Sequence, residues 1–166
     1  PQIPPLALKP SVDTGELAEL GVTYISPDEL ATEILAGSQL AVLDLRSFDF
    51  AGGQIHGAVN ITHNMILDPL ELDSVIDRFT SAAAVVFHCM LSIHRAPLCA
   101  KLYKKRLLEL GMQQKVQILE GGFSRWRQLF STNEALLDKF GTDDEAHFAE
   151  QQLELSRLFG EKVTSL

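Results

Sequence analysis

Residues 85–97 read Val-Val-Phe-His-Cys-Met-Leu-Ser-Ile-His-Arg-Ala-Pro. An apolar run that begins at Ala83 ends at His88, and a helical pattern begins at Arg95. A continuous apolar run of this length is typical of a parallel strand buried on both faces. The segment therefore predicts a strand, a short loop and a helix. This order places Cys89 at the carboxyl end of a parallel strand, where open α/β sheets form their ligand crevices.

On both sides of this segment, apolar runs of strand length alternate with helical patterns. A helix is predicted to begin at Ser26-Pro27, where Ser26 and Glu29 can form a capping box, and to end at Gly37. The other expected helices cover residues 68–79, 95–110 and 123–130, and the expected strands cover residues 40–45, 58–61, 83–87 and 116–119. Residues 49–57 are expected to form a loop. The alternation predicts an α/β domain with a mainly parallel central sheet flanked by helices.

The chain is expected to have three parts. Residues 1–23 are rich in proline and predict an extended N-terminal arm with at most a short turn. Residues 24–130 form the predicted catalytic domain. Residues 131–166 are acidic and predict a C-terminal extension of two helices, of which Phe148–Phe159 is amphipathic. This extension is expected to pack on the domain or on a second copy of the chain, which would make a homodimer.

Composition narrows the classes of function. A formal net charge of -8 over 166 residues argues against nucleic acid as the main partner, because phosphate backbones attract basic surfaces. No apolar run reaches the roughly 18–20 residues of a membrane span, and no secretion signal is apparent. The two cysteines, Cys89 and Cys99, have no metal-binding spacing, so neither a metal nor a bound cofactor is expected. A working thiol favours a reducing compartment, the cytoplasm or the nucleus.

The residue types between Cys89 and Arg95 suit attack on a tetrahedral oxyanion. A thiol is a nucleophile as its thiolate, which a helix N-terminus and a guanidinium favour. Arg95 offers a planar fork for two oxygens of a phosphate-like group. The N–H groups of the loop can hold the other oxygens. The predicted oxyanion-binding loop is made of Met90, Leu91, Ser92, Ile93 and His94. Of these, Ser92 could also bind the sulfur or a substrate oxygen through its hydroxyl.

The segment resembles the signature of the M-phase inducer phosphatases: His88-Cys89, five residues, Arg95, a small residue and Pro97. It is still more similar to the loop of the small arsenate reductases and phosphatases of fungi, plants and protozoa that share a rhodanese-like fold. Two further blocks agree. Residues 43–46 with 50–60 resemble the family's first strand and glycine-containing loop, and residues 119–126 resemble its late strand, turn and helix. The resemblance covers roughly residues 24–130 and implies a rhodanese-like α/β fold.

The resemblance also implies roles for single residues. Cys89 would be the nucleophile, Arg95 the oxyanion clamp, and Asp44 and Arg46 structural supports near the site. His88 is expected to form a hydrogen bond under the loop. The M-phase inducer phosphatases carry acidic residues inside this loop, where this chain has Met90 and His94. The proton donor is therefore open, and His94 could be either that donor or a bystander.

Cys99 follows the loop on the predicted helix, and a packed helical cysteine is favoured over a redox partner.

Four functions fit these residues to different degrees. The leading hypothesis is hydrolysis of phosphate monoesters, either phosphotyrosine or aryl phosphates, through a thiophosphate intermediate on Cys89. The first alternative is arsenate reduction, with glutathione and glutaredoxin as external reductants. Sulfur transfer through a persulfide is less favoured, because the seven-residue loop suits a phosphate-sized anion. A binding module with a vestigial site is disfavoured by the intact Cys89 and Arg95. The loop alone does not choose between phosphatase and reductase.

Overall fold

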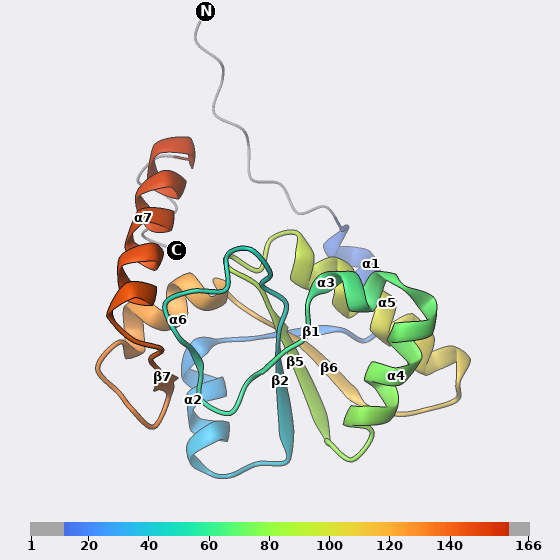
Figure 1. The fold of residues 1–166 in the computed structure, drawn as a ribbon. Helices are drawn as coiled ribbons and strands as arrows, with labels where there is room; N and C mark the ends of the chain where they lie inside the picture. The colour runs from blue at the N-terminus through green and yellow to red at the C-terminus, as the bar shows by residue number, and fades with distance from the viewer. Residues whose placement is uncertain (1–11, 160–166) are drawn as a thin grey trace, which may run out of the picture.

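A five-stranded parallel sheet lies between two layers of helices (Figure 1). The structure is a computed structural model and describes residues 12–159. The strand order is β1-β6-β5-β2-β4, and all four pairings are parallel. The strands are β1 (Thr23–Ile25), β2 (Leu40–Asp44), β4 (Val59–Asn60), β5 (Ala84–His88) and β6 (Lys115–Leu119). The predicted α/β fold with a parallel central sheet is confirmed.

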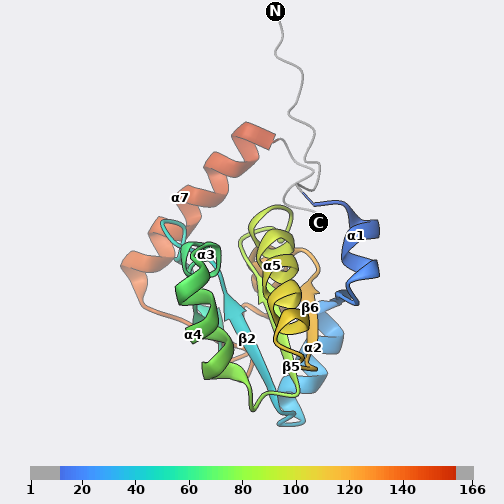
Figure 2. The same cartoon turned by 90° about the vertical axis from the view of Figure 1, so that its right-hand side faces the viewer.

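Helices cover both faces of the sheet (Figure 2). One face is covered by α1 (Thr14–Glu19), α3 (His63–Leu67), α4 (Pro69–Phe79) and α5 (Arg95–Glu109). The other is covered by α2 (Pro27–Leu35), α6 (Gly122–Phe130) and α7 (Thr142–Phe159). Each layer buries its own apolar cluster against the sheet, so β5, at the centre, is enclosed on both sides. This burial explains why its sequence is apolar from Ala84 to Phe87.

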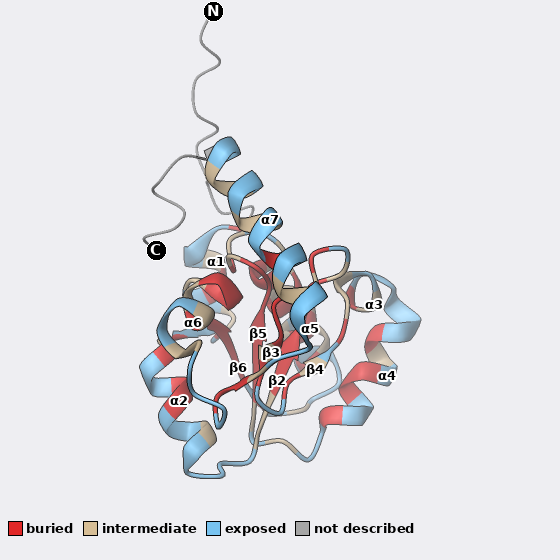
Figure 3. Ribbon diagram, turned by 60° about the vertical axis from the view of Figure 1, so that its left-hand side comes forward, coloured by how far each residue is buried: buried red, intermediate tan, exposed pale blue. Residues whose placement is uncertain are grey.

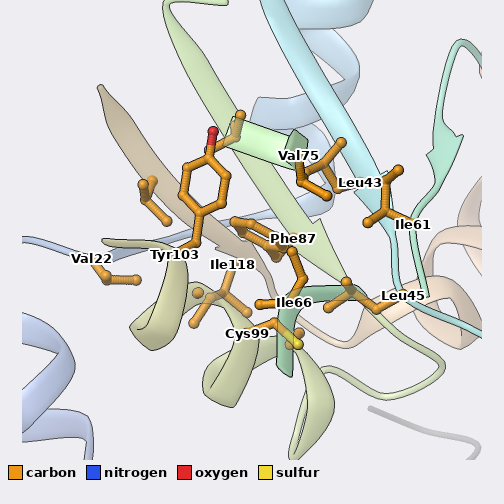
Figure 4. Close-up of a cluster of buried hydrophobic side chains, with 14 of the residues drawn as sticks. Val22, Leu43, Leu45, Ile61, Ile66, Val75, Phe87, Cys99, Tyr103 and Ile118 are labelled. Atoms are coloured by element: carbon orange, nitrogen blue, oxygen red, sulfur yellow. The ribbon is translucent and has the colours of Figure 1, made fainter. Parts of the chain in front are cut away.

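The core on the α5 face fixes the helix that follows the Cys89 loop (Figure 4). Phe87 and Tyr103 meet edge to face, with ring centroids 5.2 Å apart. Cys99 lies in the same cluster, near Ile66 and Ile118. Burial of these side chains removes apolar surface from water and holds α5 against the end of β5. The start of α5 is therefore set by packing along its whole length.

The N-terminal segment differs from the expected extended arm. Residues 14–19 form helix α1, which begins after Asp13, whose side chain accepts a hydrogen bond from Gly15 N–H at 2.8 Å. Val12, Leu17 and Val22 are buried in the core of the α5 face. The helix was not predicted because six residues are too few to show a periodic pattern. Residues 1–11 of the predicted arm lie outside the described residues.

The C-terminal extension also differs, because its described part contains one helix and a strand. Strand β7 (Leu137–Asp138) pairs antiparallel with β3 (Gln54–Ile55), inside the segment expected to be a loop. Helix α7 then runs without a break from Thr142 to Phe159, and much of its surface is exposed (Figure 3). Two-residue strands carry no alternation that sequence reasoning could detect. Residues 160–166 lie outside the described residues, and the homodimer stays a prediction.

Helix α7 is docked on the glycine turn that follows β2. The Asp144 carboxylate accepts from Gly52 N–H at 2.7 Å and Gly53 N–H at 3.0 Å. Arg127, on α6, donates to the Gly52 carbonyl and pairs with Glu145. The Phe148 ring lies so close that a Cβ built on Gly52 would come within 2.4 Å of it. Gly52 also has φ +80, a conformation that favours glycine.

We expect Gly52→Ala to lower the free energy of unfolding more than Gly57→Ala. Gly57 has a similar φ of +78, but nothing lies within 4 Å of its built Cβ, so its substitution reports backbone strain alone, about 1 kcal/mol. Gly52→Ala adds the clash with Phe148, which should lower the free energy of unfolding by a further ~1–3 kcal/mol. Urea denaturation measures both. In a Phe148→Ala background the difference between the two glycine substitutions should shrink, because the ring atoms at 2.4 and 2.5 Å are removed and only the Cβ of residue 148, at 3.0 Å, remains near the built Cβ. An undiminished difference there would contradict the docking.

Candidate active site

The Cys89 loop connects the end of β5 to the start of α5. Cys89 follows His88 directly and is only 3% exposed, and α5 begins at Arg95. Ser92, in the middle of the loop, has φ 57, the positive value of a left-handed turn that is uncommon for a residue other than glycine. Such a conformation persists where the surroundings enforce it, often at a functional site. The backbone of the loop therefore makes a left-handed turn at Ser92.

The carbonyl groups at the start of the loop are held by α6. Phe123 N–H donates to the Cys89 carbonyl and Ser124 N–H to the Met90 carbonyl, both at 2.9 Å. These donors belong to the first turn of α6, whose N–H groups have no partner within the helix. Among the described residues, no backbone carbonyl accepts from the N–H groups of the loop between Met90 and Ile93. The first two carbonyls of the loop are thus engaged, and the N–H groups of residues 90–93 are left without a backbone acceptor within the described part of the chain.

The glycines before α6 make this contact sterically feasible. Gly121 and Gly122 have φ 74 and 60. A Cβ built on Gly122 would lie 2.6 Å from the carbonyl oxygens of both Cys89 and Met90. A side chain at this position would therefore push the loop away from α6. The turn expected at residues 121–122 is present, and its close approach to the loop is what the structure adds.

Arg95 is paired with Asp49, a residue that sequence analysis did not single out. Its Nη1 and Nη2 donate to the two Asp49 carboxylate oxygens at 2.8 and 2.5 Å, and the side chains are 22% and 10% exposed. Burial raises the pKa of Asp49, but the hydrogen bonds and charge of Arg95 outweigh it, so this pKa is lowered. Asp49 is therefore ionised at neutral pH and fixes the plane of the guanidinium.

The same guanidinium faces Cys89. Burial lowers the pKa of Arg95, while the hydrogen bond with Asp49 and the negative charge of the Cys89 thiolate raise it, and the net direction is upward. Two of its five N–H donors are used by Asp49, which leaves the others for a substrate oxygen. Arg95 thus lies between a carboxylate and the thiol, and its role as an oxyanion clamp stays a prediction.

Asp44 and Arg46 form a fully buried support beneath the site. Arg46 donates twice to Asp44 through Nε, at 3.0 and 3.1 Å, and once through Nη2, at 2.7 Å. Its remaining contacts reach the carbonyls of Ala51 at 2.7 Å and Gly53 at 2.8 Å. The guanidinium also lies over the Phe123 ring, 3.8 Å from its centroid. The pair therefore joins β2, the glycine turn and α6, which agrees with a structural role.

His88 is buried under the loop. Its Nδ1 lies 3.2 Å from the Cys89 carbonyl oxygen, which can only accept, so Nδ1 carries the proton of a neutral ring. Burial is the largest cause that lowers the pKa of His88; the charges of Arg46 and Arg95 add to it, whereas Asp44 and the Cys89 carbonyl oppose it. The ring is therefore neutral at physiological pH. Its position agrees with the expected hydrogen bond under the loop.

The remaining residues singled out in the sequence differ in how far they are buried. Met90 is buried on the α6 side, where the Gln152 amide lies 3.7 Å from its sulfur. Leu91 and Ile93 are half-buried, and His94 is exposed at the last position before α5. Cys99 is buried in the core, and burial, with the Cys89 charge, raises its pKa to about 12. A thiol with such a high pKa stays protonated at neutral pH and is a poor nucleophile toward a disulfide. This favours the packing role of Cys99 over a redox role.

Two other kinds of feature are absent from residues 12–159. No helix in this range is both long enough and apolar enough to cross a membrane. No group of three or more histidine, cysteine or acidic side chains in the same range is arranged to hold a metal ion.

The Rhodanese-like domain family matches residues 26–129. The chain belongs to this family. The expected rhodanese-like fold is thereby confirmed, and the matched range contains every residue of the Cys89 loop and its supports. Asp49 lies in the matched range as well, three residues after Arg46, but its partner is 46 residues away and only the fold brings the two together.

Relatives within the family are phosphatases and arsenate reductases. The dual specificity phosphatase ibp1 of Schizosaccharomyces pombe is 26% identical over 135 residues, which cover 70% of this chain and 96% of that protein. Arsenate reductase 2.2 of Oryza sativa subsp. japonica is 30% identical over 112 residues, covering 64% and 82%. The structure of Ygr203w, a yeast protein tyrosine phosphatase of the Rhodanese family, aligns with a TM-score of 0.67 at 29% identity, covering 75% and 97%.

The Asp49–Arg95 pair predicts a pH-dependent contribution to stability. Folding lowers the pKa of Asp49. The contribution of Asp49 to stability is therefore fully present above its pKa in the unfolded chain, about 3.9, and is lost as the pH falls through its pKa in the folded protein. We expect Asp49→Asn to reduce the free energy of unfolding by about 1 kcal/mol at pH 7, since the pair is part-exposed and screened by water. Urea denaturation between pH 7 and pH 3 measures the difference from wild type, which should shrink below about pH 4.

Asp73→Asn is the matched control, because Asp73 pairs with Arg106 on the same helix as Arg95 but at the surface. Asp73→Asn should lower the free energy of unfolding at pH 7 by less than Asp49→Asn does. A cost of Asp49→Asn that is the same at pH 3 as at pH 7 would show that the ion pair does not stabilise the fold.

Proposed function

We propose that this protein is a cysteine-dependent phosphatase that hydrolyses phosphate monoesters through a thiophosphate intermediate on Cys89. The observation that carries the proposal is the orientation of the loop. Its first two carbonyls are held by α6, and Arg95 is held by Asp49 and faces the Cys89 thiolate, which leaves the loop N–H groups and the guanidinium as donors for an oxyanion at the Cys89 sulfur. Preorganised donors of this kind stabilise the charge that develops on a transferring phosphoryl group.

The first chemical step forms a bond between the Cys89 sulfur and phosphorus. The bond from phosphorus to the ester oxygen breaks, and this oxygen leaves as an alkoxide or phenoxide that takes up a proton. In the second step a water molecule attacks phosphorus and gives up a proton. The sulfur–phosphorus bond breaks, which releases inorganic phosphate and restores the thiolate. Arg95 and the loop N–H groups hold the three non-bridging oxygens in both steps.

The surroundings of the loop favour esters with good leaving groups. Asp49 stays ionised at neutral pH because of its lowered pKa, and His88 is neutral and buried, so neither suits the delivery of a proton to the leaving oxygen. His94 is exposed at the end of the loop, and both predictions for it stay open: proton donor to the leaving oxygen, or bystander. Aryl esters, whose phenoxide needs the least help, are therefore the favoured substrates.

Arsenate reduction is the second candidate, and similarity to the rice arsenate reductase favours it. Here the Cys89 thiolate would displace hydroxide from arsenate. A glutathione thiolate would then attack the Cys89 sulfur, so that arsenic leaves with the bonding electron pair as arsenite. The mixed disulfide between Cys89 and glutathione would be reduced by glutaredoxin. Two thiols thus supply the two electrons, and the loop binds arsenate as it would bind phosphate.

We expect purified protein to hydrolyse p-nitrophenyl phosphate and Cys89→Ser to abolish turnover, because a hydroxyl is a far poorer nucleophile than a thiolate. Acid quenching during turnover, followed by mass spectrometry, should find phosphate on the peptide that contains Cys89. Cys99→Ala is the matched control and should keep the activity, since Cys99 lies in the core. A parallel assay with arsenate, glutathione and glutaredoxin tests the second candidate.

Turnover of p-nitrophenyl phosphate by folded Cys89→Ser at the wild-type rate would refute the nucleophile assignment. Reduction of arsenate without hydrolysis of any aryl phosphate would replace the phosphatase by the reductase and leave Cys89 as the nucleophile.

A further inference from the structure

A cleft of about 490 Å³ lies beside the Cys89 loop. Its walls come from three parts of the chain: the loop itself, the start of α2 and the turn into α6. Helices α2 and α6 lie on the same face of the sheet in both Figure 1 and Figure 3. The lining residues from the loop are Leu91, Ser92 and Ile93; the others are Tyr24, Pro27, Asp28, Glu120, Gly121, Arg125 and Leu129. Leu91, Ser92 and Ile93 therefore belong both to the predicted oxyanion-binding loop and to the lining of the cleft.

The walls near the loop are apolar, and large apolar groups there remain open to solvent. Leu129 is 43% exposed and Tyr24 38%. Ser92, three residues after Cys89, lines the same cleft and is only 6% exposed. Its hydroxyl oxygen is buried and has no hydrogen-bond partner among the described residues, which is rare for a buried polar atom. A ligand that fills the cleft next to Ser92 would cover the apolar walls and could supply that partner.

The charges at the cleft disfavour a negative ligand. Asp28 and Glu120 contribute two carboxylates and Arg125 one guanidinium, so the lining carries a net charge of about −1 at neutral pH. Burial, and then the charge of Glu120, raise the pKa of Tyr24, which keeps its phenol neutral. An anionic group next to the phosphate would meet like charges here, whereas an uncharged ring would not.

We propose that this cleft is the leaving-group subsite, which takes an extended, uncharged aromatic group esterified to the phosphate at Cys89 and discriminates against negatively charged neighbours of that group. This assignment rests on the proposed phosphatase function, because the loop must hold the phosphate for the cleft to receive the rest of the ester. The aromatic group can belong to a small aryl phosphate or to a phosphotyrosyl side chain. Leu129 provides contact area, and Asp28 with Glu120 provides the charge selection.

Binding can be measured without turnover. In full-length Cys89→Ser, calorimetry compares 2-naphthylmethylphosphonate with methylphosphonate, which differ in the aromatic group. We expect the naphthyl ligand to bind about tenfold tighter, as an added apolar group in a fitting pocket allows. Leu129→Glu should remove this preference: the added carboxylate weakens both phosphonates by repulsion, but the naphthyl ligand should lose about tenfold more affinity than methylphosphonate. Leu110→Glu is the matched control, since Leu110 is 44% exposed and lies outside the cleft.

Charge selection is tested with peptides that carry phosphonomethyl-phenylalanine flanked by aspartate or by lysine. The lysine-flanked peptide should bind tighter, and Glu120→Gln should reduce the difference. If the naphthyl phosphonate is preferred but neither peptide binds, the aromatic group that the subsite accepts belongs to small aryl phosphates and not to phosphotyrosyl side chains.

Equal affinity for the two phosphonates would overturn the cleft assignment even if the protein hydrolyses p-nitrophenyl phosphate. A preference that survives Leu129→Glu but disappears in Phe48→Ala would also overturn it, because Phe48, 85% exposed and 5.9 Å from the Arg95 guanidinium, lies outside the cleft. A naphthyl preference that depends on Leu129, in a protein without phosphatase activity, would keep the subsite and refute only the proposed reaction.

Discussion

Two backbone hydrogen bonds, from the first turn of α6 to the carbonyls of Cys89 and Met90, are the constraint on which the site depends. In a planar trans peptide unit the carbonyl and the N–H point in opposite directions. Fixing the direction of a carbonyl therefore also fixes the direction of the N–H of the next residue. The donors are N–H groups that a helix leaves unsatisfied at its start. The terminus of α6 thereby orients the loop, and the terminus of α5 is left for the oxyanion of the proposed reaction.

The supports behind these bonds form a chain of packed groups. Arg46 lies over the Phe123 ring, and the Phe148 ring meets Phe123 edge to face with centroids 5.8 Å apart. Phe148 also sits on Gly52, whose turn is held by Arg127 and by Asp144. Displacing α7 would therefore loosen α6, and loosening α6 would release the loop carbonyls. The C-terminal helix acts as a brace of the site, although it lies outside the range that matches the family.

Local signals in the sequence identified the elements near the loop. Ser26 and Glu29 form the expected capping box, Asp68 caps α4 ahead of Pro69, and the segment from Cys89 to Arg95 bridges a strand and a helix as predicted. These features depend on neighbours within a few residues, so the sequence displays them directly. The signals of the family's other blocks likewise pointed to Asp44 and Arg46.

Long-range contacts could not be predicted in the same way. Asp49 looked like one more polar loop residue, because its bond with Arg95 exists only after the sheet has brought β2 next to β5. The pairing of β3 with β7 joins segments more than 80 residues apart, and each strand is two residues long. Gly122 was recognised as part of a turn, but its approach to the Cys89 carbonyl depends on the packing of β5 beside β6.

The most direct test of the account is the affinity of Gly122→Ala for tungstate, a tetrahedral oxyanion, measured by calorimetry beside Gly111→Ala. Both glycines have positive φ, 60 and 68, but only at Gly122 would a Cβ meet the loop carbonyls. The account predicts that Gly122→Ala binds tungstate about tenfold more weakly or worse, while Gly111→Ala binds like wild type. Circular dichroism checks that both variants are folded. Wild-type tungstate affinity in folded Gly122→Ala would contradict the claim that α6 orients the loop.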